Sequence, residues 1–383
     1  MKQKHFLSLS IFFLISVLLI VINYPQIKSK TLSNNKFSNK AGFSGYTPNQ
    51  IKKAYGLDKL NFYGNNQKIA IIVAYGSDTI SEDLSVFNKK FNLQETNLQI
   101  VYPQGKSGEL ELEDMLWVKE TTLDVQWAHA LAPKAQILLV IAKTSSKNDL
   151  LNAIEYATKN SADIISISWR FNEFKNQYLY NQYFDNENII YVAASGDNGA
   201  AVSWPSVHPN VLSVGGTTLS LNQEGKIIGE ETAWYNSGGG ISKYFDKPNY
   251  QNELTGKDIQ YRSVPDVSFL GDMSKGVSIY CSNPLIKDNG WLTLAGTSLG
   301  APCWAAFMAI ANEASGMRIK NIHEELYNIA KNDKQHTNFN DIVKGDNGVL
   351  NAKDGYDCVT GLGTPHFDIL LKSLLSKSSN KLY

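Results

Sequence analysis

The hydrophobic positions of this chain gather into short uninterrupted runs instead of alternating with polar residues. Five of these runs have the length of strands: 68–73, 136–141, 163–168, 189–194 and 211–214. Between them, segments 81–91 and 148–157 have the spacing of helices. Strands that are apolar at nearly every position are typical of a parallel sheet covered on both faces. The pattern therefore predicts an α/β fold, a doubly wound parallel sheet with helices on both faces.

Another apolar run opens the chain and has the features of a targeting segment. Lys2 and Lys4 precede an uncharged stretch at 6–24, whose length lies between that of a signal-peptide core and that of a spanning helix. No small-x-small cleavage site follows it. We expect residues 1–27 to be an uncleaved membrane anchor, with a cleaved export signal as the alternative. In both cases the main domain is expected to work outside the cytoplasm.

The rest of the chain is expected to form a polar linker at 28–44 and one large domain at 45–383. Lysine plus arginine and aspartate plus glutamate number 36 each. This balance gives no reason to expect a nucleic-acid partner. The three cysteines fit no zinc pattern, and we expect Cys303, in an apolar helix, to be buried. We expect a monomer whose stability does not depend on a disulfide framework.

A glycine-flanked serine is the first candidate for chemistry. Gly-Thr-Ser-Leu-Gly-Ala-Pro, at 296–302, precedes the apolar run 303–310, so Ser298 lies where a loop becomes a buried helix. We expect Pro302 in the first turn of this helix, where its missing N–H costs nothing. Free N–H groups and the helix dipole there would assist an oxyanion formed by a Ser298 nucleophile. An N-cap serine without chemistry fits the same pattern.

Two acidic elements lie upstream of this serine. Glu120 and Asp124 lie four residues apart in a helix expected over 114–131, so they share one face. Repulsion there raises one pKa, as a base towards serine requires, although a solvated acidic face is the alternative. Asp197, in Ser-Gly-Asp-Asn-Gly, follows a buried strand. It is either a turn residue or, if protonated, a donor to an oxyanion.

No histidine has the local setting of a catalytic base. His129 is the best placed, but it is five residues beyond Asp124 and therefore on another face of the same helix. A subtilisin-like enzyme that uses His129 is for this reason a disfavoured hypothesis. The histidines after it lie outside any glycine-framed motif: His208, His323, His336 and His366.

In this order, Glu-x-x-x-Asp, Ser-Gly-Asp and Gly-Thr-Ser-x-x-x-Pro resemble the sedolisins, the serine-carboxyl peptidases with a subtilisin-like fold. The resemblance runs from Tyr46 to the C-terminal helix. It implies that Ser298 is the nucleophile and Glu120 the general base. Asp124 would orient Glu120 and share its proton, and Asp197 would donate to the oxyanion beside the Ser298 N–H. The implied activity is that of an endopeptidase that cleaves peptides or proteins, fastest at acidic pH.

The resemblance also implies a calcium site near the C-terminus. Segments 340–343 and 355–363 resemble the calcium loops of the family, and carboxylates together with backbone carbonyls suit a hard cation. The implied ligands are the carboxylates of Asp341 and Asp357 and the carbonyls of Ile342, Lys353 and Gly355. Asp346 and Asp354 are expected to be solvated loop residues.

Three departures from the family pattern affect these expectations. Val73 stands where many members carry a glutamate, which shortens the acidic network. Arg170 stands where glycine usually follows Trp169 beside the substrate strand, and should alter substrate preference or access. Only the expected anchor and linker precede Tyr46, where family precursors have a long prodomain. These departures keep open a catalytically silent surface-binding protein on the same fold, although the four intact catalytic positions argue against it.

Overall fold

The computed structural model describes residues 45–108 and 114–380, which lie in the compact unit Ser38–Tyr383. The anchor expected at 1–27 and the linker expected at 28–44 lie outside the described residues. Within the described ranges, no helix combines the length and the apolar character needed to cross a membrane.

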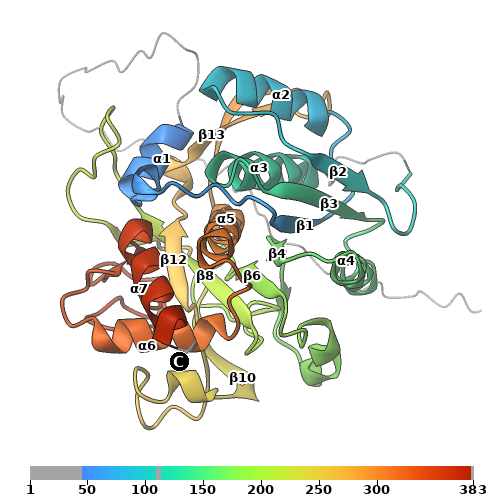
Figure 1. The fold of residues 1–383 in the computed structure, drawn as a ribbon. Coiled ribbons are helices and arrows are strands. Elements are labelled where there is room, and N and C mark those ends of the chain that lie inside the picture. The colour runs from blue at the N-terminus through green and yellow to red at the C-terminus, as the bar shows by residue number, and fades with distance from the viewer. Residues whose placement is uncertain (1–44, 109–113, 381–383) are drawn as a thin grey trace, which may run out of the picture. The chain divides into compact units, whose positions relative to one another are not determined.

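A mostly parallel sheet of eight strands forms the centre of the fold (Figure 1). Its strand order is β12-β8-β6-β4-β1-β3-β2, every neighbouring pair in this order is parallel, and β9 pairs with β8 in the antiparallel direction. The strands are β1 (Lys68–Ala74), β2 (Leu98–Val101), β3 (Gln136–Ala142), β4 (Ile164–Ile167), β6 (Ile190–Ala194), β8 (Val211–Thr218), β9 (Thr232–Ala233) and β12 (Val267–Leu270).

Four small two-stranded sheets and the helices surround this centre. The paired strands are β5 (Phe171–Asn172) with β7 (Ser203–Trp204), β10 (Gly240–Asp246) with β11 (Tyr261–Val264), β13 (Val277–Cys281) with β14 (Gly290–Leu294), and β15 (Phe339–Asn340) with β16 (Thr364–Pro365). The α-helices are α1 (Pro48–Ala54), α2 (Ile80–Phe91), α3 (Met115–Leu131), α4 (Lys147–Lys159), α5 (Thr297–Ser315), α6 (Ile322–Asn332) and α7 (Phe367–Asn380). Short 3-10 helices span Leu57–Lys59, Gln177–Tyr183, Asn249–Gln251 and Met273–Lys275.

The apolar runs form this sheet because it is covered on both faces. Six consecutive residues of β1 are buried, and since successive side chains of a strand point to opposite faces, neither face of β1 is open to water. Helix α5 lies over the middle of the sheet, where it contacts β4, β6 and β8 (Figure 1). The five predicted strands are present as β1, β3, β4, β6 and β8, and the predicted helices as α2, α3, α4 and α5. The α/β fold class is confirmed.

The position of Pro302 differs from the expectation. Helix α5 begins at Thr297, so Pro302 is its sixth residue and lies in the second turn, not the first. A proline at this position cannot donate the hydrogen bond that the Ser298 carbonyl would receive in a regular helix. The helix therefore begins earlier than predicted. The Ser298 carbonyl, near its start, is available to another donor.

Candidate active site

The catalytic candidates meet at the C-terminal edge of the parallel sheet, where ligands bind in open α/β sheets. Ser168 directly follows β4, Asp197 lies three residues beyond β6, and Ser298 is the second residue of α5. Helix α3, which carries Glu120 and Asp124, packs against α5. Residues far apart in the sequence thus come together because α3 packs against α5, whose first residues lie near the C-terminal ends of β4 and β6.

Ser298 is buried but keeps an accessible fraction of 9%. Its Oγ lies 3.4 Å from the carbonyl oxygen of Ser168. The Oγ of Ser168 donates to Asp124 Oδ1 at 2.9 Å and also lies 3.3 Å from the Ser298 carbonyl oxygen. That carbonyl is the one that Pro302 leaves without a helical donor. Ser168 therefore joins the nucleophile's backbone to the acidic helix α3.

Glu120, which is half-buried, and Asp124, which is buried, form a pair of carboxyl groups on α3. Burial is the main cause that raises the pKa of Glu120 above its ordinary value; the charge of Asp197 raises it further, whereas hydrogen bonding with the Ser298 and Ser168 hydroxyls lowers it. Burial, and then repulsion by Glu120, raise the pKa of Asp124 well above its ordinary value. Asp124 is fully buried. One oxygen of each group, Glu120 Oε1 and Asp124 Oδ2, is buried without a hydrogen bond from the described residues, so the pair favours binding a proton.

Asp197 is fixed by the first residue of α5. The N–H and the Oγ–H of Thr297 both donate to Asp197 Oδ1, at 2.8 and 2.7 Å. Burial raises the pKa of Asp197, although these two hydrogen bonds and the positive charge of Arg170 oppose the shift. Because Oδ1 already accepts two bonds, we assign the proton of the neutral acid to Oδ2. In this state Asp197 can donate to an oxyanion.

Gly296 allows this close approach between the acid and the helix. Its φ is +104°, a conformation that favours glycine, and a Cβ at this position would lie 2.6 Å from Asp197 Oδ2. The position of Asp197 therefore requires a glycine at residue 296, two residues before Ser298.

The structure also places Val73 and Arg170, two of the three departures from the family pattern. Val73 is fully buried within β1, so this position adds an apolar side chain and no carboxylate to the network. Arg170 lies after β4, and its side chain lies over Gly196, the residue before Asp197. The guanidinium thus stands next to the proposed oxyanion donor.

His129 is not placed to act as a base towards Ser298. Its side chain is buried on α3, and its Nε2 lies 2.8 Å from the carbonyl oxygen of Gln94. Burial lowers the pKa of His129 to about 4. The helix geometry that disfavoured a histidine-dependent mechanism is confirmed.

The expected calcium ligands lie around one loop. The N–H of Gly355 donates to Asp341 Oδ2 at 2.8 Å, and the N–H of Lys353 donates to Asp357 Oδ2 at 3.1 Å. Burial raises the pKa of both carboxyl groups, although hydrogen bonds from the backbone oppose the shift. Two carboxylates on a loop with backbone carbonyls are the type of ligands that a hard cation takes.

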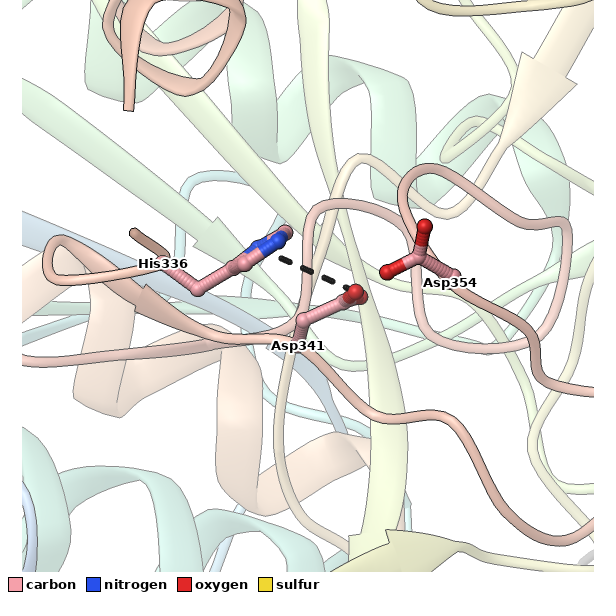
Figure 2. Close-up of side chains that lie close together, drawn as sticks. All are labelled: His336, Asp341 and Asp354. Atoms are coloured by element: carbon pink, nitrogen blue, oxygen red, sulfur yellow. Dashed lines mark ion pairs between the residues drawn. The ribbon is translucent and has the colours of Figure 1, made fainter. Parts of the chain in front are cut away.

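Two further side chains flank Asp341. His336 Nδ1 lies 3.8 Å from Asp341 Oδ2, and Asp354 offers a carboxylate oxygen to the same group (Figure 2). Asp354, expected to be a solvated loop residue, is exposed but lies within this group. His336 is also exposed, and exposed acidic groups are common without an ion, so the proximity of these residues does not by itself assign a metal to them.

Two residues of the site lacked assigned roles in the sequence. Ser168 and Thr297 were present only as members of short motifs, but Ser168 binds Asp124 and Thr297 binds Asp197. The available signal was their position, because Ser168 ends a buried strand and Thr297 directly precedes the nucleophile.

The cysteines behave as expected. Cys303 is fully buried within α5, and all three cysteines are free.

Comparisons with known proteins bear directly on this site. The model of the subtilase family matches residues 118–347, a range that includes all four catalytic candidates. Kumamolisin of Bacillus sp. (strain MN-32) is 29% identical over 93% of the chain, and tripeptidyl-peptidase 1 of Dictyostelium discoideum is 27% identical over 92% of it. The chain spans 69% and 62% of the length of these two relatives.

A solved structure agrees in fold. Pseudomonas sedolisin, a serine-carboxyl proteinase complexed with two molecules of pseudo-iodotyrostatin, matches with a TM-score of 0.78 and 25% identity. The match covers 88% of this chain and 99% of that one. Sphericase, at 17% identity and a TM-score of 0.53, shares the fold.

Proposed function

The chain belongs to the subtilase family and, within it, to the sedolisins, and from this premise we propose that it is a serine-carboxyl endopeptidase. Its relatives support a serine-type peptidase. The triad, the acidic pH optimum, the endopeptidase specificity and the calcium site are our proposals. The geometry around Ser298 supports the triad and the pH dependence, and the carboxyl groups of Asp341 and Asp357 support the calcium site.

In the proposed reaction, the Ser298 Oγ attacks the carbonyl carbon of the scissile bond and transfers its proton to Glu120. Asp197 and the backbone N–H of Ser298 donate to the resulting oxyanion. Collapse of this intermediate forms a serine ester and breaks the C–N bond, and the proton on Glu120 passes to the leaving amine. Water then hydrolyses the ester, with Glu120 again acting as the base.

The observation that carries this proposal is the set of three carboxyl groups, one buried and two half-buried, around one hydroxyl at a helix N-terminus. Their pKa values are raised, and a raised pKa makes Glu120 a stronger base than an ordinary carboxylate. Asp197 donates only while it is protonated, and its raised pKa extends that state above the ordinary range. We therefore expect hydrolysis to be fastest below neutral pH, where Glu120 and Asp124 together hold a single proton and Asp197 is still neutral, and to fall as Asp197 ionises.

Two substitutions test the chemistry. Ser298→Ala and Glu120→Gln should each remove most of the peptide hydrolysis while leaving the melting temperature close to that of the wild type, because base and nucleophile act as one unit. Labelling by an active-site serine probe should be lost in Ser298→Ala. Near-normal turnover in Glu120→Gln would rule out a carboxylate base, and an unlabelled, inactive wild type would favour the silent binding protein.

The endopeptidase specificity needs a separate test, because tripeptidyl-peptidases are among the relatives. A peptide with a blocked N-terminus and a fluorophore pair across an internal bond distinguishes the two activities. An endopeptidase should cut it, whereas an enzyme that requires a free N-terminus should cut only the unblocked form. Exclusive release of tripeptides from the unblocked peptide would contradict the proposal.

We also propose that Asp341 and Asp357 hold a calcium ion together with the carbonyls of Ile342, Lys353 and Gly355. A ligand bound only by the folded state stabilises it by mass action. Chelation should lower the melting temperature by about 5 °C, which corresponds to an ion present at roughly a hundred times its dissociation constant. Calcium should restore the temperature in the wild type but not in Asp357→Asn. A melting temperature that stays the same at a saturating concentration of chelator would refute the calcium site.

Export, with membrane attachment through residues 1–27, is proposed from the charged start and the apolar run of the sequence. Expression of the full chain followed by fractionation checks this. The protein should be found outside the cytoplasm and should remain with membranes after a high-salt wash. Recovery of the full-length chain from the cytosol would contradict it.

A further inference from the structure

Arg170 stands between two anchored aromatic residues. Trp169 and Phe171 contact each other with ring centroids 5.9 Å apart, and both pack on Trp204, at 6.3 and 6.1 Å. Phe171 also pairs with Trp204 in the small sheet β5–β7. Trp169 is buried, with 6% exposed. The backbone that carries Arg170 is therefore held in place from both sides.

The side chain of Arg170 is directed across the loop that carries the proposed oxyanion donor. An ideal Cβ built on Gly196 would lie 2.7 Å from Arg170 Cδ and 3.0 Å from its Nε. The arginine thus occupies the space that the missing side chain of Gly196 leaves, and its Nη1 reaches Asn172 Oδ1 at 3.4 Å. This fit fixes the guanidinium on the side of the site where Asp197 lies.

The charge of Arg170 acts on the reacting region. It is the positive group that lowers the pKa of Asp197, while burial lowers the pKa of Arg170 itself and the charge of Asp197 opposes that loss. In the proposed reaction Asp197 is neutral, so it contributes no negative charge next to the half-buried guanidinium. A carboxylate brought in by the substrate would then replace that charge.

We propose that Arg170 is a specificity-determining residue that selects peptides with an acidic side chain on the residue that contributes the scissile carbonyl. This inference rests on the proposed function, because it takes Asp197 and the Ser298 N–H as the groups that face the carbonyl oxygen. The side chain next to that carbonyl belongs to the same substrate residue. It is therefore the substrate group nearest to a guanidinium on the oxyanion side of the nucleophile.

The test compares two quenched fluorescent peptides that differ only by Glu or Gln at this residue. At a pH above about 4.3, where a glutamate side chain is ionised, kcat/KM should be about tenfold higher for the Glu peptide. The advantage should decrease as salt screens the charges and should vanish below pH 4 as the substrate glutamate binds a proton. A Glu/Gln pair on the leaving side of the bond should show no preference.

Variants at two arginines separate specificity from folding. Arg170→Gln should bring the Glu/Gln ratio close to one without changing the melting temperature, and Arg170→Lys should retain part of the preference. Arg170→Glu should reverse it in favour of a Lys peptide. The matched control is Arg318→Gln, because Arg318 pairs with Asp163 just before β4 whereas Arg170 follows β4, and this variant should keep the wild-type ratio.

The outcomes distinguish this inference from the proposed function. Cleavage of the Gln peptide with a Glu/Gln ratio of one in the wild type, or an unchanged preference in Arg170→Gln, would refute the role of Arg170 alone. A preference confined to the leaving side would refute it equally. If neither peptide is cut and Ser298 is not labelled, the peptidase itself is refuted.

Discussion

Replacement of Ser168 by alanine tests how the acidic pair is coupled to the nucleophile. Ser168 donates to Asp124 Oδ1 at 2.9 Å, and Asp124 Oδ2 is buried without a donor among the described residues. Ser168→Ala would therefore remove the hydrogen bond to Asp124 Oδ1 and leave neither oxygen of this carboxyl group with a donor among the described residues. It would also remove the hydroxyl next to the Ser298 carbonyl.

The expected loss follows from the charge on the acceptor. A hydrogen bond to a charged group contributes about 1.5–3 kcal/mol, and each 1.4 kcal/mol corresponds to a tenfold change in rate. If the bond acts mainly as Glu120 takes up the proton, kcat should fall by about 10- to 150-fold while KM changes little. Hydrogen bonding by Ser168 also lowers the pKa of Glu120 and of Asp124. Without it both pKa values rise, less Glu120 is ionised at low pH, and the acid limb of the rate profile moves to higher pH.

The assay is a set of pH–rate profiles for the wild type, Ser168→Ala and a control. Ser166→Ala is the matched control, because Ser166 is fully buried two residues earlier in β4 and its hydroxyl has no hydrogen-bond partner within the described ranges. It should keep the wild-type profile. A Ser168→Ala enzyme within about threefold of the wild type in kcat, with an unmoved acid limb, would refute the coupling.

Three further outcomes can be measured with the same profiles. Asp197→Asn should keep a neutral donor at higher pH and so flatten the alkaline fall, even if peak turnover drops; a profile identical to that of the wild type, with a maximum well above neutral, would make Asp197 a turn residue. Gly296→Ala should lower kcat by about tenfold or more, because the new Cβ displaces Asp197; unchanged kcat would contradict this. His129→Gln should keep the turnover number of the wild type, because His129 binds the Gln94 carbonyl and not Ser298. An inactive His129→Gln variant would instead favour a mechanism in which a histidine is the base.

The parallel sheet could be predicted from the sequence because its signal is local. Each buried strand is a continuous apolar run, and burial on both faces leaves no polar alternation to obscure it. The short strands β5 and β7 were not predicted, since two residues contain no periodicity. Strand β8 was predicted too short. Gly215 and Gly216 indicated the end of the strand in the sequence, but both residues lie within β8.

The site could be predicted only in part, for a physical reason. The spacing of Glu120 and Asp124 places them on one helix face, since the contact is local. No local rule brings Asp197 to Thr297 across 100 residues of sequence, or Ser168 to Ser298 across 130. The resemblance to a family linked Glu120, Asp124 and Asp197 to Ser298, but the contacts of Ser168 and Thr297 came only from the structure.

Pro302 links the geometry of α5 to the chemistry at its start. A proline inside a helix removes one backbone donor, and in α5 the acceptor left behind is the carbonyl of the nucleophile, Ser298. The Ser168 hydroxyl lies 3.3 Å from this carbonyl and donates to Asp124 at 2.9 Å. A defect in the helix thus gives the end of β4 a contact with the nucleophile's backbone and, through the same hydroxyl, with the carboxyl pair on α3. Because this hydroxyl carries one proton, it donates to Asp124 or to the Ser298 carbonyl at any one time, so the two acceptors share a single donor between the acidic pair and the nucleophile's backbone.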